Sequence, residues 1–108
     1  MASSRDYLTF VLDQLSQLEG VSSRAMMGEY ILYVDSKVVG GIYDDRLLIK
    51  PTSSALAMMP EADRELPYKG GREMLLADRM EDREFLCRLL EAVAGDLPAP
   101  KRKRRSYR

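Results

Sequence analysis

The chain of 108 residues has the length of a single domain with one hydrophobic core. It contains no histidine and one cysteine, Cys87, which excludes an internal disulfide, a Cys–His nucleophile pair and a structural zinc site within one chain. The charges sum to zero, but six of the seventeen basic residues lie in the last eight positions. The preceding body therefore has eleven bases, seventeen acids and a net charge of −6.

The N-terminal segment predicts an amphipathic helix over residues 4–19. Ser3 or Ser4 can cap its first turn, Ser3 with Asp6 resembles a capping box, and Gly20 is placed to end the helix. One apolar stripe recurs at helical spacing and comprises Leu8, Val11, Leu12, Leu15 and Leu18. The chain has no apolar run long enough to span a membrane, and its N-terminus lacks a secretory-signal pattern, so we expect a cytoplasmic protein.

The next segment predicts three or four antiparallel strands joined by tight turns. Asp35-Ser36 and Asp44-Asp45 are candidates for two-residue turns. Gly40-Gly41 indicates a β-bulge or a close approach of two backbones within a strand. The expected strands are rich in aromatic and β-branched residues and cover residues 22–27, 29–34, 37–43 and 46–50.

The second half predicts two more helices and two short strands. Pro67 cannot donate to a β-ladder, which favours an edge position for its strand. Asp78 and Glu81 form a capping-box pattern before the last helix. The expected elements are a short helix over 54–59, edge strands over 66–68 and 73–77, and a helix over 81–94.

This order predicts an α+β two-layer sandwich. An antiparallel sheet with one apolar face needs a cover, and the two long amphipathic helices can supply it. The domain is expected to span residues 1–97. A tail hinged at Pro98 and Pro100 follows over residues 98–108, and its composition predicts disorder.

The tail is the strongest electrostatic feature of the sequence. Its bases could neutralise nucleic-acid phosphates, and Tyr107 could stack on a base. The alternatives are a solubilising tail and a tail that binds the acidic body of its own chain. The candidate nucleic-acid-binding residues are Lys101, Arg102, Lys103, Arg104, Arg105 and Arg108.

The remaining candidates for chemistry have structural explanations. Asp35, Asp44 and Asp45 could bind a cation or act as an acid–base pair, but aspartate is also common in tight turns, and we favour the turn. Gly40-Gly41 and Gly70-Gly71 lack the sequence context of a phosphate-binding loop. Cys87 lies among apolar helix positions and is expected to be a structural thiol, with redox sensing as the alternative.

Several polar side chains of the predicted sheet could line a shallow pocket if they converge in space. The paired methionines Met26-Met27 and Met58-Met59 are interpreted as core filler. The candidate pocket residues are Arg24, Tyr30, Tyr33, Tyr43, Lys50 and Tyr68.

The strand segment also resembles a known family. The matching stretches are residues 24–28, residues 30–35 with Lys37, the run through Gly41, and residues 45–50, with 66–68 and 74–76 further along. On these residues the chain resembles the N-terminal domain of the TfoX/Sxy family, bacterial regulators of natural competence, over about residues 5–95. The resemblance implies a sandwich of the order α-β(3)-α-β(2)-α and a role in gene regulation through protein partners, with no established enzymatic chemistry.

The sequence departs from the family pattern in three places. Met27-Gly28-Glu29 stands where the family commonly has Phe-Gly-Gly, and Asp35-Ser36 stands where it has Asp-Gly. Longer members carry a helical C-terminal domain, whereas this sequence continues into the basic tail.

We therefore expect a non-enzymatic regulator, of competence or of transcription, that acts through protein–protein contacts and needs no cofactor or metal. An unpaired strand edge, such as residues 73–77, could pair two copies into a dimer. One alternative is a nucleic-acid accessory protein that binds through the tail. Another is a small-ligand-binding protein or enzyme that uses the tyrosine, arginine and lysine surface.

Overall fold

The computed structural model describes residues 3–77 and 79–99, so the predictions about Asp78 and the tail 101–108 lie outside the described residues. Within these ranges no helix is long and apolar enough to cross a membrane. The elements, in chain order, are α1 (Arg5–Gln14), β1 (Val21–Met26), β2 (Glu29–Val34), β3 (Lys37–Tyr43), β4 (Arg46–Ile49), α2 (Ser53–Met58), β5 (Arg64–Glu65), β6 (Met74–Leu76) and α3 (Arg83–Asp96).

The strands form one antiparallel sheet in the order β1-β2-β3-β4-β6-β5, which confirms the predicted α+β class. Four strands precede α2, where the sequence left three or four open. β6 lies between β4 and β5, with Leu48 opposite Leu76, so the prediction of an edge strand over 73–77 is wrong. The edges are β1 and β5. The pairing of β4 with β6 joins segments far apart in the sequence, for which the local pattern gives no signal.

Three two-residue turns connect the first four strands. Met27-Gly28, Asp35-Ser36 and Asp44-Asp45 all have positive φ at both positions, as type I′ turns require. The flanking residues pair directly across each turn, for example Met26 with Glu29 and Tyr43 with Arg46. The two predicted aspartate turns are therefore confirmed, and they fix the register of the hairpins.

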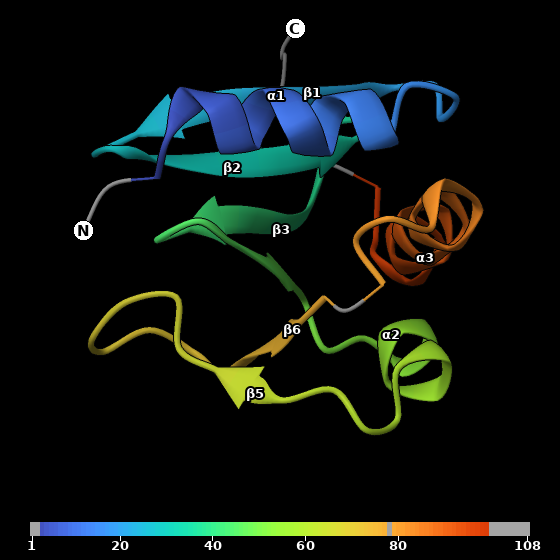
Figure 1. The fold of residues 1–108 in the computed structure, drawn as a ribbon. Coiled ribbons are helices and arrows are strands. Elements are labelled where there is room, and N and C mark those ends of the chain that lie inside the picture. The colour runs from blue at the N-terminus through green and yellow to red at the C-terminus, as the bar shows by residue number, and fades with distance from the viewer. Residues whose placement is uncertain (1–2, 78, 100–108) are drawn as a thin grey trace, which may run out of the picture.

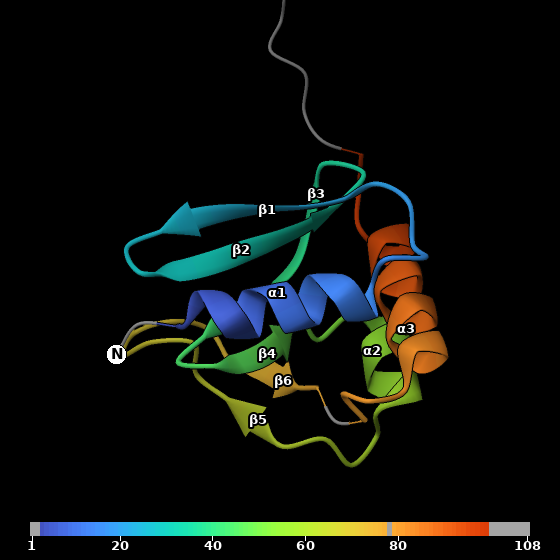
Figure 2. The same ribbon diagram turned by 45° about the horizontal axis from the view of Figure 1, so that its top comes forward.

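The core lies between the sheet and all three helices. Figures 1 and 2 show the strands running from β1 at one end of the sheet to β5 at the other, with α2 and α3 packed beside each other. Alternate strand residues face this core, and the helices bury their apolar stripes against them. The buried cluster includes Val11 and Leu15 before β1, Leu32, Val34, Ile42, Leu47 and Ile49 in the sheet, and Leu86, Leu89, Leu90 and Val93 in α3.

Gly40 and Gly41 lie where neighbouring backbones come close, as the sequence predicted. A β-bulge shifts the β2–β3 register, because Leu32 pairs with Gly40 and Tyr33 with Val38. A Cβ atom placed on Gly40 would lie 2.2 Å from the Leu48 carbonyl oxygen. A side chain at residue 40 would therefore force β3 and β4 apart.

The main differences from the predicted elements concern α1, α3 and the strand over 66–68. α1 ends at Gln14, and the apolar stripe continues through turns, where Leu15 is still 1% exposed. α3 begins at Arg83 because the Asp82 carboxylate, and not an earlier residue, accepts the Phe85 N–H at 3.0 Å. The predicted strand over 66–68 is wrong, because β5 ends at Glu65 and Pro67 lies buried in the following loop.

Candidate functional site

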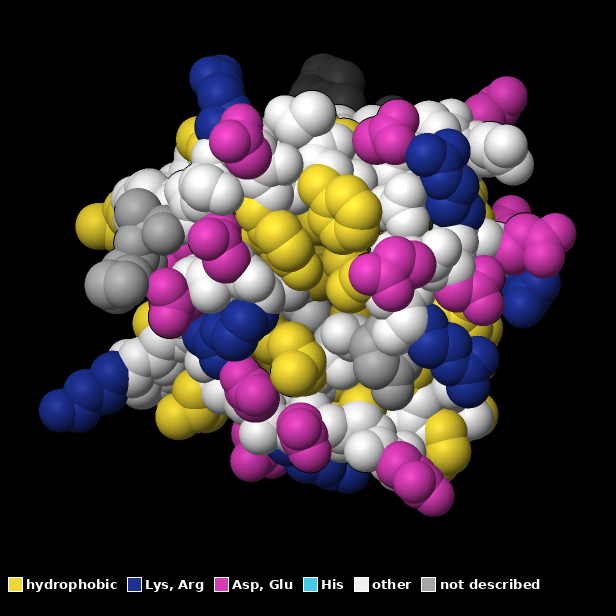
Figure 3. Space-filling model, in the orientation of Figure 1, with side chains coloured by type: hydrophobic (Ala, Val, Ile, Leu, Met, Phe, Trp, Pro, Cys, Tyr) yellow, Lys and Arg dark blue, Asp and Glu magenta, His cyan; other side chains and the backbone are white. Residues whose placement is uncertain are grey.

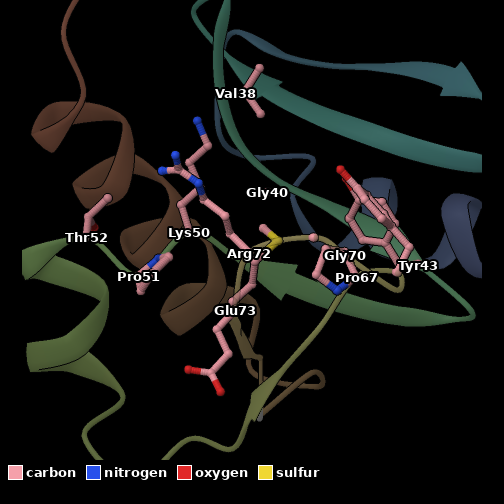
Figure 4. A pocket seen from close by; sticks show the side chains of 13 residues that line it. Val38, Gly40, Tyr43, Lys50, Pro51, Thr52, Pro67, Gly70, Arg72 and Glu73 are labelled. Carbon is pink, nitrogen blue, oxygen red and sulfur yellow. The ribbon is translucent and has the colours of Figure 1, made fainter.

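A pocket of about 670 Å³ lies on the face of the sheet opposite the main core. Tyr43 belongs to that face, since it alternates with Ile42, which is in the core. Three segments form its walls: β3 from Val38 to Tyr43, the Lys50–Thr52 connection and the loop from Pro67 to Met74. Figure 4 shows these segments around the cavity.

The structure brings together three of the six predicted pocket residues. Tyr43, Lys50 and Tyr68 line this pocket, and the rings of Tyr43 and Tyr68 meet edge to face with centroids 6.1 Å apart. Arg24 and Tyr33 instead border a separate shallow depression of about 330 Å³. Tyr30 packs against the core. Arg24 and Lys50 therefore do not converge.

Sequence reasoning missed Arg72, which is the second cation of the pocket. In Figure 4 the side-chain nitrogens of Lys50 and Arg72 point toward the same part of the cavity, whereas the carboxylate of Glu73 points away from them. Within residues 3–77 and 79–99, neither cation forms an ion pair. The sequence did contain a signal for Arg72. It directly follows Gly70-Gly71, and a glycine-containing loop can fold back over a strand and carry such a side chain to a binding site.

The phenol of Tyr43 has a raised pKa. Burial is the largest cause, and the neighbouring Tyr68, Glu29 and Tyr33 add to it through unfavourable charge interactions. The hydroxyl is therefore neutral at physiological pH and can donate a hydrogen bond. The pocket can thus bind a polar group through a phenol and two cations. No pair of residues with the geometry of a nucleophile and its base is found among its described side chains.

The aspartates of the Asp44-Asp45 turn make hydrogen bonds that stabilise the fold. Asp45 accepts a hydrogen bond from the Ser4 backbone N–H at 2.7 Å, at the start of α1, where a negative charge is favourable. Glu29 accepts from the Ser3 hydroxyl at 2.6 Å and from the Asp44 N–H at 3.1 Å. These bonds tie the first residues of the chain to two turns, and no group of potential metal ligands is found in the described ranges.

The open edge of the sheet carries exposed methionines. Met26 is 43% exposed and Met27 is 96% exposed, so their interpretation as core filler is wrong. Met58 and Met59 do pack in the core as predicted. The difference arises because Met27 occupies the tip of a hairpin, where no second layer covers it.

Cys87 is half-buried, and its sulfur lies 3.8 Å from the Gln14 carbonyl oxygen, which matches the predicted structural thiol. Arg83, one turn before it, binds Asp13 and Gln14 instead of the thiol. The redox alternative stays a prediction. The candidate nucleic-acid-binding residues of the tail lie outside the described residues.

Comparison with known proteins identifies the family. The sequence model of the TfoX N-terminal domain matches residues 13–94, from the end of α1 through most of α3. The chain belongs to the TfoX N-terminal domain family. It is similar to a Spirochaeta aurantia protein described as an uncharacterized 12.7 kDa protein in the trpE 5′ region. The two are 39% identical over 102 residues, which cover 94% of this chain and 89% of that protein. No solved structure matches the chain.

Proposed function

We propose that this member of the TfoX N-terminal domain family is a non-enzymatic regulatory domain that acts by pairing with another protein chain along β1. The observation that supports this proposal is the open edge of the sheet. β1 extends over six residues, Val21–Met26, and contacts β2 on one side only (Figure 2). Outside its ladder with β2, it makes no hydrogen bond to any other described residue.

An open strand edge carries a row of unpaired backbone N–H and C=O groups, which can pair with another strand. Met26 and Glu29 flank a two-residue turn and face each other as a hydrogen-bonded pair. Hydrogen bonding then alternates along the antiparallel ladder. Val21, Ser23 and Ala25 consequently direct their backbone groups away from β2, toward the open side.

A second copy of the chain is the partner that this edge fits best. A two-fold axis at Ser23 places Ser23 opposite itself and Val21 opposite Ala25 of the other copy, so all the outward-facing residues pair. In this register Arg24 faces Ser22 of the other copy, which avoids a direct meeting of like charges. Met26 and Met27 then lie beside the Val21 end of the other β1 strand.

Light scattering tests this proposal. We expect the wild-type mass to rise from one chain toward twice its 12.3 kDa as the concentration rises through the micromolar range. Ser23→Pro removes the central outward N–H of both copies and should weaken association at least about tenfold. Ala99→Pro, in an exposed segment far along the chain, is the matched control. A single-chain mass at all concentrations, with no partner retained in a pull-down, would refute the proposal.

The family, and not the geometry, supports a proposal for the regulated process. The resemblance implies regulation of competence or transcription in the bacterial cytoplasm through protein partners, and the β1 edge supplies a surface on which such a partner could bind.

The basic tail supports a second function, a nucleic-acid accessory role. Six bases within eight residues are the observation that favours it. We expect duplex DNA binding that weakens steeply as salt is raised, and that is lost when residues 101–108 are deleted. Equal binding by the truncated chain would eliminate this role, and the same truncation should leave the association through β1 unchanged.

A further inference from the structure

We propose that the pocket beneath the Pro67–Met74 loop binds a small organic anion with a flat apolar body, such as an aromatic carboxylate or phosphate. This site is distinct from the β1 edge, and it stands or falls independently of the pairing proposed above. It rests on the size of the pocket, its two cations and its tyrosine wall.

The volume fits a small molecule. The pocket measures about 670 Å³, within the range of roughly 300–1,000 Å³ that is usual for ligand sites. Gly70 lies in the loop over the pocket, has φ of +87°, and a Cβ atom added to it would meet nothing within 4 Å. Gly71 is closely packed, since a Cβ atom there would lie 3.0 Å from Pro67 Cγ. At Gly70 the loop therefore places no side chain in the pocket.

Two cations give the site its preference for an anion. Lys50 is half-buried and Arg72 is exposed, and neither has an ion-pair partner among the described residues. A partly desolvated ammonium without a partner is unfavourable unless a ligand or water supplies the missing contacts. The guanidinium of Arg72 also presents a planar set of donors that matches a carboxylate or phosphate.

The sign of the charge here is opposite to that of the body. The folded body carries a net charge of −6 before the tail, and in Figure 3 acidic and basic side chains are interspersed over the face that carries α1. In the pocket, Lys50 and Arg72 face the cavity while the one acid that lines it, Glu73, points away (Figure 4). A local positive site on an acidic protein favours the binding of an anionic group at that place.

The other walls of the pocket are aromatic and apolar, and they can contact an aromatic ring of the ligand. Tyr43 and Tyr68 form one side, and Val38, Pro51 and Met74 add apolar surface. Aromatic side chains stack against flat apolar groups, and the neutral Tyr43 hydroxyl can hydrogen-bond to a polar substituent. The two cations of the pocket can therefore bind a charged group, and its tyrosine and apolar walls can contact a flat ring.

The test uses three probes of similar size: benzoate, phenyl phosphate and the neutral benzyl alcohol. In ¹H–¹⁵N NMR titrations of the full chain, we expect saturable shifts of the Gly40, Gly70 and Gly71 amides with at least one of the two anions. Benzyl alcohol should bind at least about tenfold more weakly, because it lacks the charge that Lys50 and Arg72 recognise. The two anions distinguish a carboxylate from a phosphate ligand.

Variants place the binding in this pocket. The double substitution Lys50→Met and Arg72→Met removes both charges, keeps an unbranched side chain at each position and should weaken anion binding at least about tenfold. Arg24→Met removes an exposed cation of the other depression and should leave binding unchanged. No saturable shift with either anion at about 10 mM, equal binding of benzyl alcohol, or unaltered binding by the folded double variant would each overturn the proposal.

Discussion

The two edges of the sheet are built differently. At one edge, β5 has only two residues, both charged, and its Glu65 forms an ion pair with Arg46 of β4. The buried Pro67 lies two residues after β5, and the following loop folds back over the sheet. At the other edge, β1 has six residues, no proline and one charged residue, Arg24.

Short strands, charges and prolines are the usual means by which proteins prevent edge-to-edge pairing. This chain uses all three at β5 and hardly any at β1, where it adds two exposed methionines. The covered end of the sheet lies next to the pocket, and the open end is where we propose that another chain pairs. The predictions below change the surroundings of the pocket or the open end, in order of decreasing effect.

The largest effect is expected from Gly40→Ala, in the inner strand β3 beside the pocket. The added Cβ would lie 2.2 Å from the Leu48 carbonyl oxygen, so β3 and β4 must separate. We expect a loss of roughly 3–5 kcal/mol in the free energy of unfolding, measured with urea. Gly95→Ala is the matched control, because it lies in α3 with nothing within 4 Å and should stabilise the chain by up to about 1 kcal/mol. Equal changes in the free energy of unfolding for the two variants would contradict this prediction, because β3 and β4 would then accommodate the added Cβ atom without loss of stability.

A smaller effect is expected at the open end from Met27→Asn, which should raise stability and weaken association. Met27 has φ of 53°, a conformation that asparagine adopts more readily. The variant should be more stable by about 0.5–1 kcal/mol in urea unfolding and yet associate more weakly in light scattering, since the exposed apolar tip is lost.

Met26→Thr separates these two contributions. Met26 lies in the regular part of β1 and is also exposed, so this change should weaken association without the gain in stability. Stronger association of either variant would contradict the role of the methionine tip.

The smallest effect concerns the junction of α2 and α3, next to the pocket. The Ser54 N–H donates to Asp96 at 2.7 Å, and this bond, with further side-chain hydrogen bonds, lowers the pKa of Asp96. A lowered pKa in the folded state stabilises the fold above the unfolded pKa, and the contribution is lost as the pH falls through the folded value.

Asp96→Asn should therefore shift the urea midpoint slightly downward near neutral pH. The difference from wild type should shrink as the pH falls below about 4. Glu61→Gln, in an exposed loop, is a control that should show no such change. A difference that grows toward low pH would contradict the assignment.

The sequence predicted the local parts of this fold well. The first four strands agree within one residue because aspartate turns and alternating apolar residues are local signals. The position of β6 was wrong because its neighbours in the sheet are set by a pairing between distant segments, in which Leu75 enters the core.

The site was predicted in part for the same reason. Tyr43 and Lys50 lie close in sequence on a hairpin and its exit, so their joint occurrence was a reasonable expectation. Arg24 was placed with them wrongly because two strands separate β1 from β4 in the sheet. Arg72 was missed because it reaches the pocket from a loop whose path depends on the position of β6.

Hydrogen exchange along β1 tests the central claim most directly. Pairing of β1 with a second copy predicts that the amides of Ser23 and Ala25 exchange quickly in dilute protein and become protected as the concentration rises. The amides of Ser22 and Arg24, which face β2, should be protected throughout, and Ser23→Pro should leave Ala25 unprotected at every concentration. Rapid exchange of Ser23 and Ala25 in concentrated wild-type protein would contradict the claim that β1 is the pairing surface.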